Sequence, residues 1–226
     1  MYKSKNIDII LSKMQLILNG HSTNPQDIQV KQFLDCANDL FKKWANTFTT
    51  GYLNSINENQ FWEIFIEFLR ECRNGSWSQM ARHENEIEKY KSQLFQLVKD
   101  LIANSTDLGT VLNLIKDATF SGRSNKIKGL SPFILTGIMF ASDQNSFMIL
   151  DQPVLDFFTT DAQDALTLQT YQNILNISQA YAKKYKLSMW HVNKAYGILG
   201  NNNQMPVKKL CNQCFPKSFK VFDYPF

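Results

Sequence analysis

The sequence predicts an all-α protein, and three observations lead to this expectation. Apolar residues recur at steps of three and four in most of the chain, which is the spacing of one face of an α-helix. Residues that favour helix starts precede several of these segments, such as Asn24 before Pro25 and Asn57 three residues before Gln60. Strand-like patterns are sparse, and we interpret the short apolar run Ser146–Leu150 as an extended linker between two helices.

Amphipathic segments divide the chain into nine expected helices. The second is typical, because its apolar residues keep helical spacing from Val30 to Phe48, and the third carries a similar face from Phe61 to Cys72. The expected helices cover residues 5–18, 25–48, 57–72, 83–103, 106–119, 131–141, 152–158, 168–186 and 188–199.

The turn residues between these segments separate helices and do not mark a flexible linker between domains. We therefore expect one unit over residues 1–226, built as two closely packed helical lobes with a cleft between them. Residues 1–105 form most of the N-terminal lobe in this prediction, and residues 106–200 form the second lobe. Residues 201–226, which include three prolines, are expected to wrap the surface.

The composition is that of a folded protein and excludes several classes of site. Apolar residues make up 44% of the 226 residues and charged residues only 19%, so the chain can bury a core. It has neither a glycine-rich phosphate loop nor the nucleophile elbow of hydrolases. Three histidines and one C-x-x-C pair, Cys211 and Cys214, are too few ligands for a metal centre, so we expect no metal.

The chain shows no targeting or membrane signal. Charges are spread through the first twenty residues, and no stretch approaches the roughly 20 apolar residues that a membrane span needs. Four cysteines do not form a disulfide framework at this length. We therefore expect a cytoplasmic protein without a membrane partner, and no obligate protein partner is indicated.

Charge is distributed unevenly along the chain. Residues 1–120 hold 13 Lys and Arg against 14 Asp and Glu, whereas residues 121–226 hold 11 against 6. This asymmetry favours an anionic partner for the second half, although such an excess is also common in ordinary proteins. Four lysines of the later helices either extend this basic surface or form a hydrated helix face: Lys183, Lys184, Lys186 and Lys194.

The connection between the helices expected at 106–119 and 131–141 has the features of a phosphate clamp. It carries Arg123, Lys126 and Lys128 and no acidic residue, and Gly129 stands at its tip. A helix start after such a turn points backbone N–H groups at an anion, and the cations add salt-sensitive attraction. The same residues also suit a solvated loop with an ordinary turn glycine.

The segment Ile127–Ser131, followed after 20 residues by Asp151, resembles the helix-hairpin-helix (HhH-GPD) superfamily of DNA glycosylases. Those proteins carry a glycine-containing hairpin, a helix, and an aspartate about twenty residues after the last hairpin glycine. The aliphatic residues Met148–Leu150 before the aspartate and Val154 after it also match the pattern. The resemblance covers residues 121–158, with a loose similarity in the overall helical plan, and it implies a helix-hairpin-helix glycosylase-like fold.

The resemblance implies a monofunctional glycosylase that binds double-stranded DNA and flips a base out of the duplex. Asp151 stabilises the oxocarbenium character left on the sugar and orients the attacking water in such a mechanism. No cofactor is implied, although the hairpin position allows a monovalent cation. The resemblance places Arg123, Lys126, Lys128, Gly129 and Ser131 on the DNA backbone. The candidates for the base pocket are Trp190, His191 and Phe133.

The chain departs from the family pattern at four positions. Ser131 replaces the last hairpin glycine, and Gln152 and Pro153 follow the aspartate in place of the usual pair. Phe133 stands where bifunctional members carry the lysine that forms a Schiff base, which is why strand cleavage is not expected. The substrate base stays open. A divergent member of the family would suit a modified base, such as those of phage DNA. Its role would then be defence rather than repair.

Plainer interpretations remain beside each of these expectations. Asp151 could serve only as a helix N-cap, in a non-catalytic helix-hairpin-helix DNA-binding module of a restriction or defence system. A helical scaffold that binds protein is a further alternative. Trp190 and His191 are as easily core residues as pocket residues. Trp77 suits the interface between the lobes, and spacing alone does not place the neighbouring pair Arg82 and His83.

Overall fold

The computed structural model describes residues 2–21, 25–72 and 84–200, and these ranges contain twelve helices and no strand. The all-α prediction is therefore confirmed for this part of the chain. The helices are α1 (Tyr2–Leu18), α2 (Pro25–Ala45), α3 (Thr50–Ser55), α4 (Glu58–Cys72), α5 (Glu84–Glu88), α6 (Lys91–Ala103), α7 (Leu108–Thr119), α8 (Pro132–Ser142), α9 (Gln152–Phe158), α10 (Ala162–Ala165), α11 (Leu168–Tyr185) and α12 (Met189–Gly200). None of them is long and apolar enough to cross a membrane.

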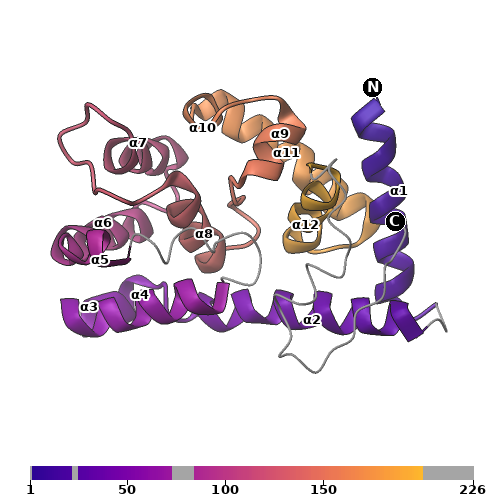
Figure 1. The fold of residues 1–226 in the computed structure, drawn as a ribbon, viewed down its shortest axis with the longest axis horizontal. Coiled ribbons are helices and arrows are strands. Elements are labelled where there is room, and N and C mark those ends of the chain that lie inside the picture. The colour runs from indigo at the N-terminus through magenta and orange to yellow at the C-terminus, as the bar shows by residue number, and fades with distance from the viewer. Residues whose placement is uncertain (1, 22–24, 73–83, 201–226) are drawn as a thin grey trace.

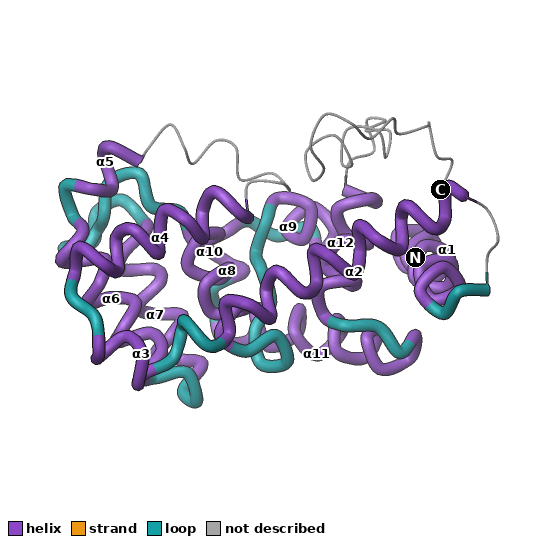
Figure 2. Tube along the Cα trace, turned by 90° about the horizontal axis from the view of Figure 1, so that it is seen from below, coloured by secondary structure: helices purple, strands orange, loops and turns teal. Residues whose placement is uncertain are grey.

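The helices pack as two groups that α2 connects. Helix α1 packs on α11 and α12, and α12 lies along α9, whereas α3, α4, α7 and α8 all contact α6 or one another. Helix α2 runs beneath both groups, with contacts to α1, α8 and α12 (Figure 1, Figure 2). This packing does not follow the expected boundary at residue 105, because α1 joins the C-terminal helices and α7 and α8 join α6.

An aromatic chain makes the core continuous between the two groups. Phe41 of α2 contacts Phe140 of α8 edge-on, with ring centroids 5.2 Å apart, and Trp190 of α12 at 4.9 Å. Trp44, one turn later in α2, contacts Phe68 of α4, with ring centroids 5.4 Å apart. Edge-to-face pairs of this kind add to the free energy gained from burial alone. The core residues of α2 therefore hold the two groups together.

Capping side chains set the helix boundaries that the spacing of apolar residues does not locate. The expected capping box at the start of α4 is present: Asn57 Oδ1 accepts from the N–H of Gln60 at 3.1 Å, and Gln60 Oε1 accepts from the N–H of Asn57 at 2.9 Å. The expected helix 25–48 instead ends at Ala45, and Thr49 caps the unexpected helix α3. The expected helix 83–103 is divided into α5 and α6, and Asp161 caps the unexpected short helix α10.

The linker interpretation of Ser146–Leu150 is confirmed. The segment has no regular secondary structure, and the part from Phe147 to Leu150 is buried. It leads directly into α9, whose bounds agree with the expected helix 152–158. The chain thus carries an extended, apolar strip through its core immediately before Asp151.

Candidate functional site

Asp151 is the N-cap of α9. Its Oδ1 accepts a hydrogen bond from the backbone N–H of Val154 at 3.2 Å, and its own backbone is extended, as an N-cap requires. Pro153 lies in the first turn of the helix, where its missing N–H is not needed. The capping role is therefore present in the structure. It does not exclude a chemical role for the same carboxylate.

Buried polar side chains hold the linker before Asp151. Its backbone groups cannot reach water, so each needs a partner inside the protein. The side chain of Tyr171 on α11 pairs with both backbone groups of Met148. The Tyr171 hydroxyl accepts a hydrogen bond from the N–H of Met148 at 2.8 Å and donates one to the carbonyl of Met148 at 2.9 Å. Tyr171 is only 1% exposed, so this pair of bonds is sealed from solvent.

Two further helices complete the support of the linker. Thr136 of α8 accepts a hydrogen bond from the N–H of Leu150 at 3.1 Å. Asn193 of α12 donates through its side-chain amide to the carbonyl of Ile149 at 3.2 Å. Side chains from α8, α11 and α12 therefore fix the three residues that precede Asp151, and so fix where its carboxylate lies.

The electrostatic environment of Asp151 penalises its charge. The residue is 8% exposed, and burial raises the pKa of its carboxyl to about 6. The ammonium of Lys194 and the N–H of Val154 oppose this rise, and the carboxylate of Asp156 adds to it. Asn or Ser would cap the helix as well without a buried charge. A carboxyl with a strongly raised pKa is a common feature of functional sites.

Trp190, a candidate for the base pocket, lies in the core between α2 and α12. Its ring contacts Phe41, and the ammonium of Lys194 lies over it at 4.1 Å from the centroid. The residue is 6% exposed, so in this conformation its ring offers no open face to a base.

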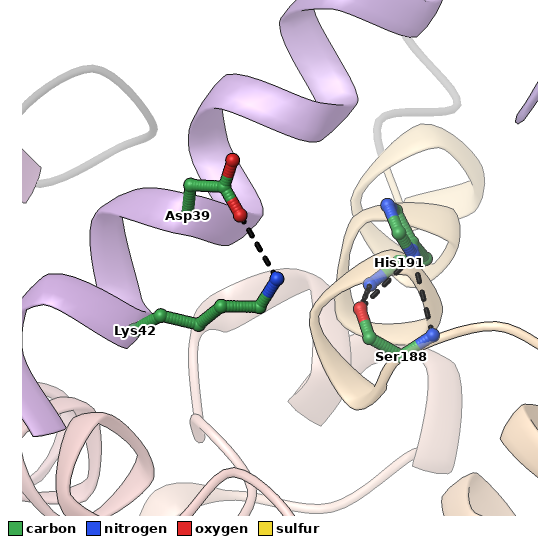
Figure 3. A network of polar contacts seen from close by, with 4 residues as sticks. All are labelled: Asp39, Lys42, Ser188 and His191. Carbon is green, nitrogen blue, oxygen red and sulfur yellow. Dashed lines mark hydrogen bonds and ion pairs between the residues drawn. The ribbon is translucent and has the colours of Figure 1, made fainter.

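His191 is buried at the start of α12 and faces the part of α2 that carries Asp39 and Lys42 (Figure 3). Its Nδ1 accepts from the N–H of Ser188 at 3.2 Å and lies 2.9 Å from the Ser188 hydroxyl. Burial lowers the pKa of His191 to about 4, against the opposing charge of Asp35, so the ring is neutral at pH 7. These contacts are those of a structural histidine that completes the helix start.

Phe133, the third pocket candidate, is partly buried in the first turn of α8 and packs against the core.

The hairpin turn forms around Gly129. Leu130 donates its N–H to the carbonyl of Ile127 at 3.2 Å, and Gly129 has a φ of +86°, which favours glycine at that position of the turn. Ser131 follows as the N-cap of α8 with a φ of −114°. That conformation is open to any residue, so serine in place of glycine adds no backbone strain at this position. The connection from α7 to α8 is longer than a tight turn and spans residues 120–131.

The expectation of a clamp free of acids is wrong in three dimensions. Lys128 forms an ion pair with Glu86 of α5 at 2.9 Å, and Arg123 pairs with Asp117 of α7 at 3.7 Å. Glu86 is distant from the loop in the sequence, whereas Asp117 lies in the last turn of the helix that precedes it. Glu86 is partly exposed and the other three side chains are exposed, so these pairs are weak and a phosphate can displace them. Lys126 donates to the hydroxyl of Ser121 at 2.8 Å.

Two hollows lined by described residues lie away from Asp151. One of about 210 Å³ is beside the hairpin loop and includes Asp117 and Ile127 in its lining. One of about 500 Å³ lies between the end of α8 and α11 and includes Asp143 and Gln179. Neither of these two hollows is lined by Asp151 or by a pocket candidate.

The remaining sequence expectations fall partly outside the described residues. Trp77, Arg82, His83, Cys211 and Cys214 all lie there. Within the described ranges, no three metal-ligating side chains gather in one place.

Sequence reasoning missed Tyr171, Thr136 and Asn193, which hold the linker. It assigned Lys194 either to the basic surface or to a hydrated helix face. The sequence signal that could have identified these residues is a polar residue at a position where the helical pattern predicts an apolar one. Such a signal marks a buried polar group without naming its partner.

Comparison with known proteins does not assign a function to this chain. No family model matches the chain, and no significant match was found among curated proteins or solved structures. Function is therefore argued from the residues of the site rather than from a relative.

Proposed function

We propose that this protein is a monofunctional DNA glycosylase that releases a damaged or modified base and leaves an abasic site. One observation carries the proposal: Asp151 keeps a carboxylate in a buried, pre-positioned place where an uncharged cap would be more stable. Three buried polar side chains support the linker that positions it. Such support suits a group that has to meet a reacting atom.

The chemistry asks for a fixed negative charge. When the base leaves with the electrons of the glycosidic bond, positive charge develops on the sugar, and a nearby carboxylate stabilises it. A water molecule then adds to the sugar carbon, and its proton passes to Asp151 or to solvent. With a pKa of about 6, Asp151 is mostly ionised at pH 7.5 and still basic enough to orient that water.

The α7–α8 connection supports the DNA part of the proposal. The turn at Gly129 leads into the N-terminus of α8, where backbone N–H groups favour a phosphate. Arg123, Lys126 and Lys128 lie in the same connection, and phosphate can displace the ion pairs of Arg123 and Lys128. Because Asp151 is 8% exposed, neighbouring side chains have to move before a flipped base can touch it.

The second candidate is a non-catalytic DNA-binding module, and a specific observation favours it. Asp151 already makes a complete N-cap hydrogen bond to Val154, which would be its whole role in a module of this kind. Both candidates predict DNA affinity that falls as salt rises, whereas a scaffold that binds only protein does not. The two DNA-binding candidates differ only in chemistry at Asp151.

The deciding experiment measures base release. Wild type, Asp151→Asn and the control Asp156→Asn are incubated with duplexes that carry natural, damaged and heavily modified bases, and alkali then reveals abasic sites. Asp156 lies on the exposed side of the same helix and does not cap it, so it controls for a change of charge in α9. We expect wild type and Asp156→Asn to form abasic sites and Asp151→Asn to bind DNA without forming them. Salt-sensitive binding without base release by any of the three proteins would establish the binding module instead.

A further inference from the structure

Thr136 places a hydroxyl in an otherwise apolar part of α8. Every residue from Ile134 to Ala141 is buried, and Thr136, which is 1% exposed, is the one among them that carries a polar side chain. A buried hydroxyl costs free energy unless it is hydrogen-bonded. Valine is branched in the same way, so packing alone does not explain a hydroxyl at this position.

This hydroxyl bridges the first turn of α8 to the linker. It donates its proton to the carbonyl of Phe133 at 3.2 Å, and its oxygen accepts from the N–H of Leu150 at 3.1 Å. A hydroxyl has one proton and two lone pairs, so the two bonds can exist together. Leu150 directly precedes Asp151. A single atom therefore joins the start of α8 to the residue before the carboxylate.

The other two supports of the linker come from the opposite group of helices. Tyr171 belongs to α11 and Asn193 to α12, and both of these helices pack on α1. Thr136 instead lies on the helix whose N-terminus follows the turn at Gly129. Of the three supports, Thr136 is thus the one that connects Asp151 to the end of α8 where phosphate is proposed to bind.

We propose that Thr136 is a positioning residue, which fixes the distance between a DNA phosphate at the start of α8 and the carboxylate of Asp151. In DNA, covalent bonds set the spacing between a phosphate and the neighbouring sugar. An enzyme that holds the phosphate and acts on the sugar has to keep a matching spacing in its own structure. The effect on base release rests on the proposed glycosylase function, whereas the hydrogen-bonded link between α8 and the linker does not.

The structural part of the test measures amide hydrogen exchange by NMR in the full chain. Thr136→Val removes the acceptor of the Leu150 N–H, which should then exchange about tenfold faster, and Thr136→Ser should retain the wild-type rate. The matched control is Thr119→Val. Thr119 is a buried threonine of α7 whose hydroxyl donates to the carbonyl of Ile115 at 2.7 Å, within its own helix. Its substitution should leave the exchange of Leu150 unchanged.

The functional part compares base release with DNA affinity, on the duplex that wild type processes. At saturating enzyme, Thr136→Val should release the base about tenfold more slowly in a single turnover, because a small displacement of a reacting group costs at least this much. Its Kd for the duplex should stay at the wild-type value. Thr136→Ser should restore the rate, and Thr119→Val should match wild type in both measurements.

Three outcomes would contradict the proposal. Unchanged exchange of Leu150 in Thr136→Val would remove the link. Equal slowing of base release by Thr136→Val and Thr119→Val would indicate a general loss of packing, and a slower rate matched by weaker DNA binding would place Thr136 in the phosphate site itself. If Leu150 exchanges faster in Thr136→Val while wild type releases no base from any duplex, the link stands, and the glycosylase function fails together with the positioning role.

Discussion

The hydroxyl of Tyr171 satisfies both backbone groups of Met148, 23 residues away, with hydrogen bonds of 2.8 and 2.9 Å. In a sheet a neighbouring strand would supply these two partners, and here one phenol replaces it. Burial raises the pKa of Tyr171, so the hydroxyl keeps the proton that it donates to the Met148 carbonyl. The linker can therefore cross the helical core with both backbone groups of Met148 paired.

Tyr171→Phe should destabilise the protein by about 3 kcal/mol, because it leaves one buried N–H and one buried carbonyl without partners. Urea denaturation monitored by circular dichroism measures the change in the free energy of unfolding. The control is Tyr181→Phe, a half-buried tyrosine on the same helix, which should cost well under half as much. Equal losses in the two variants would mean that the linker does not depend on Tyr171.

The helical architecture could be predicted because its signals are local. Spacing of apolar residues identifies α9 and the linker before it, and the Asn57–Gln60 pair marks the start of α4 within three residues. Short helices escape this reasoning. Helix α3 depends on the cap that Thr49 provides, and six residues are too few to show a period.

The supports of the candidate site could not be predicted because their partners are distant in sequence. Asn193 reaches Ile149 across 44 residues. The ion pair between Glu86 and Lys128 likewise joins α5 to the hairpin loop, which is why a loop without acids in sequence has acids beside it in space. A helical pattern states which face is buried, and it does not state which helix covers that face.

Asp151→Asn should stabilise the protein at high pH. Folding raises the pKa of Asp151 from its ordinary 3.8 to about 6, so the folded state binds more protons than the unfolded state between these values. The stability contributed by this residue therefore falls as pH rises from about 4 to 6. Above that window the ionised carboxylate costs on the order of 3 kcal/mol, which Asn avoids while it retains the cap.

The measurement is the free energy of unfolding of both proteins from pH 4 to pH 8. Their difference should grow with pH and vanish toward pH 4. His191 titrates in the opposite sense, because burial lowers its pKa to about 4 and stability is lost as pH falls below about 6.5. Both proteins share that loss, so the difference isolates Asp151. Asp161→Asn, at the exposed cap of α10, is the control. A difference that does not vary with pH would show that burial does not penalise the charge of Asp151.

Glu86→Gln should tighten the binding of duplex DNA if the α7–α8 connection contacts its backbone. The Glu86 carboxylate pairs with Lys128 at 2.9 Å and with Lys89 at 3.2 Å, so it competes with phosphate for the loop lysine and repels the phosphate itself. Removing this charge should raise affinity by about threefold at low salt, and the gain should shrink as salt rises. Fluorescence anisotropy with a labelled duplex at several salt concentrations measures both effects.

The matched control is Glu67→Gln, which removes an exposed acid paired with Lys43 and changes net charge equally. Lys128→Gln should weaken binding and reduce the slope of log affinity against log salt by about one, as the loss of one phosphate contact does. When the two substitutions are combined, Glu86→Gln should raise the DNA affinity of Lys128→Gln by less than it raises that of wild type, because the lysine that it releases is absent. If Glu86→Gln and Glu67→Gln have the same effect, DNA does not lie on the hairpin, and the turn at Gly129 is only a connection between two helices.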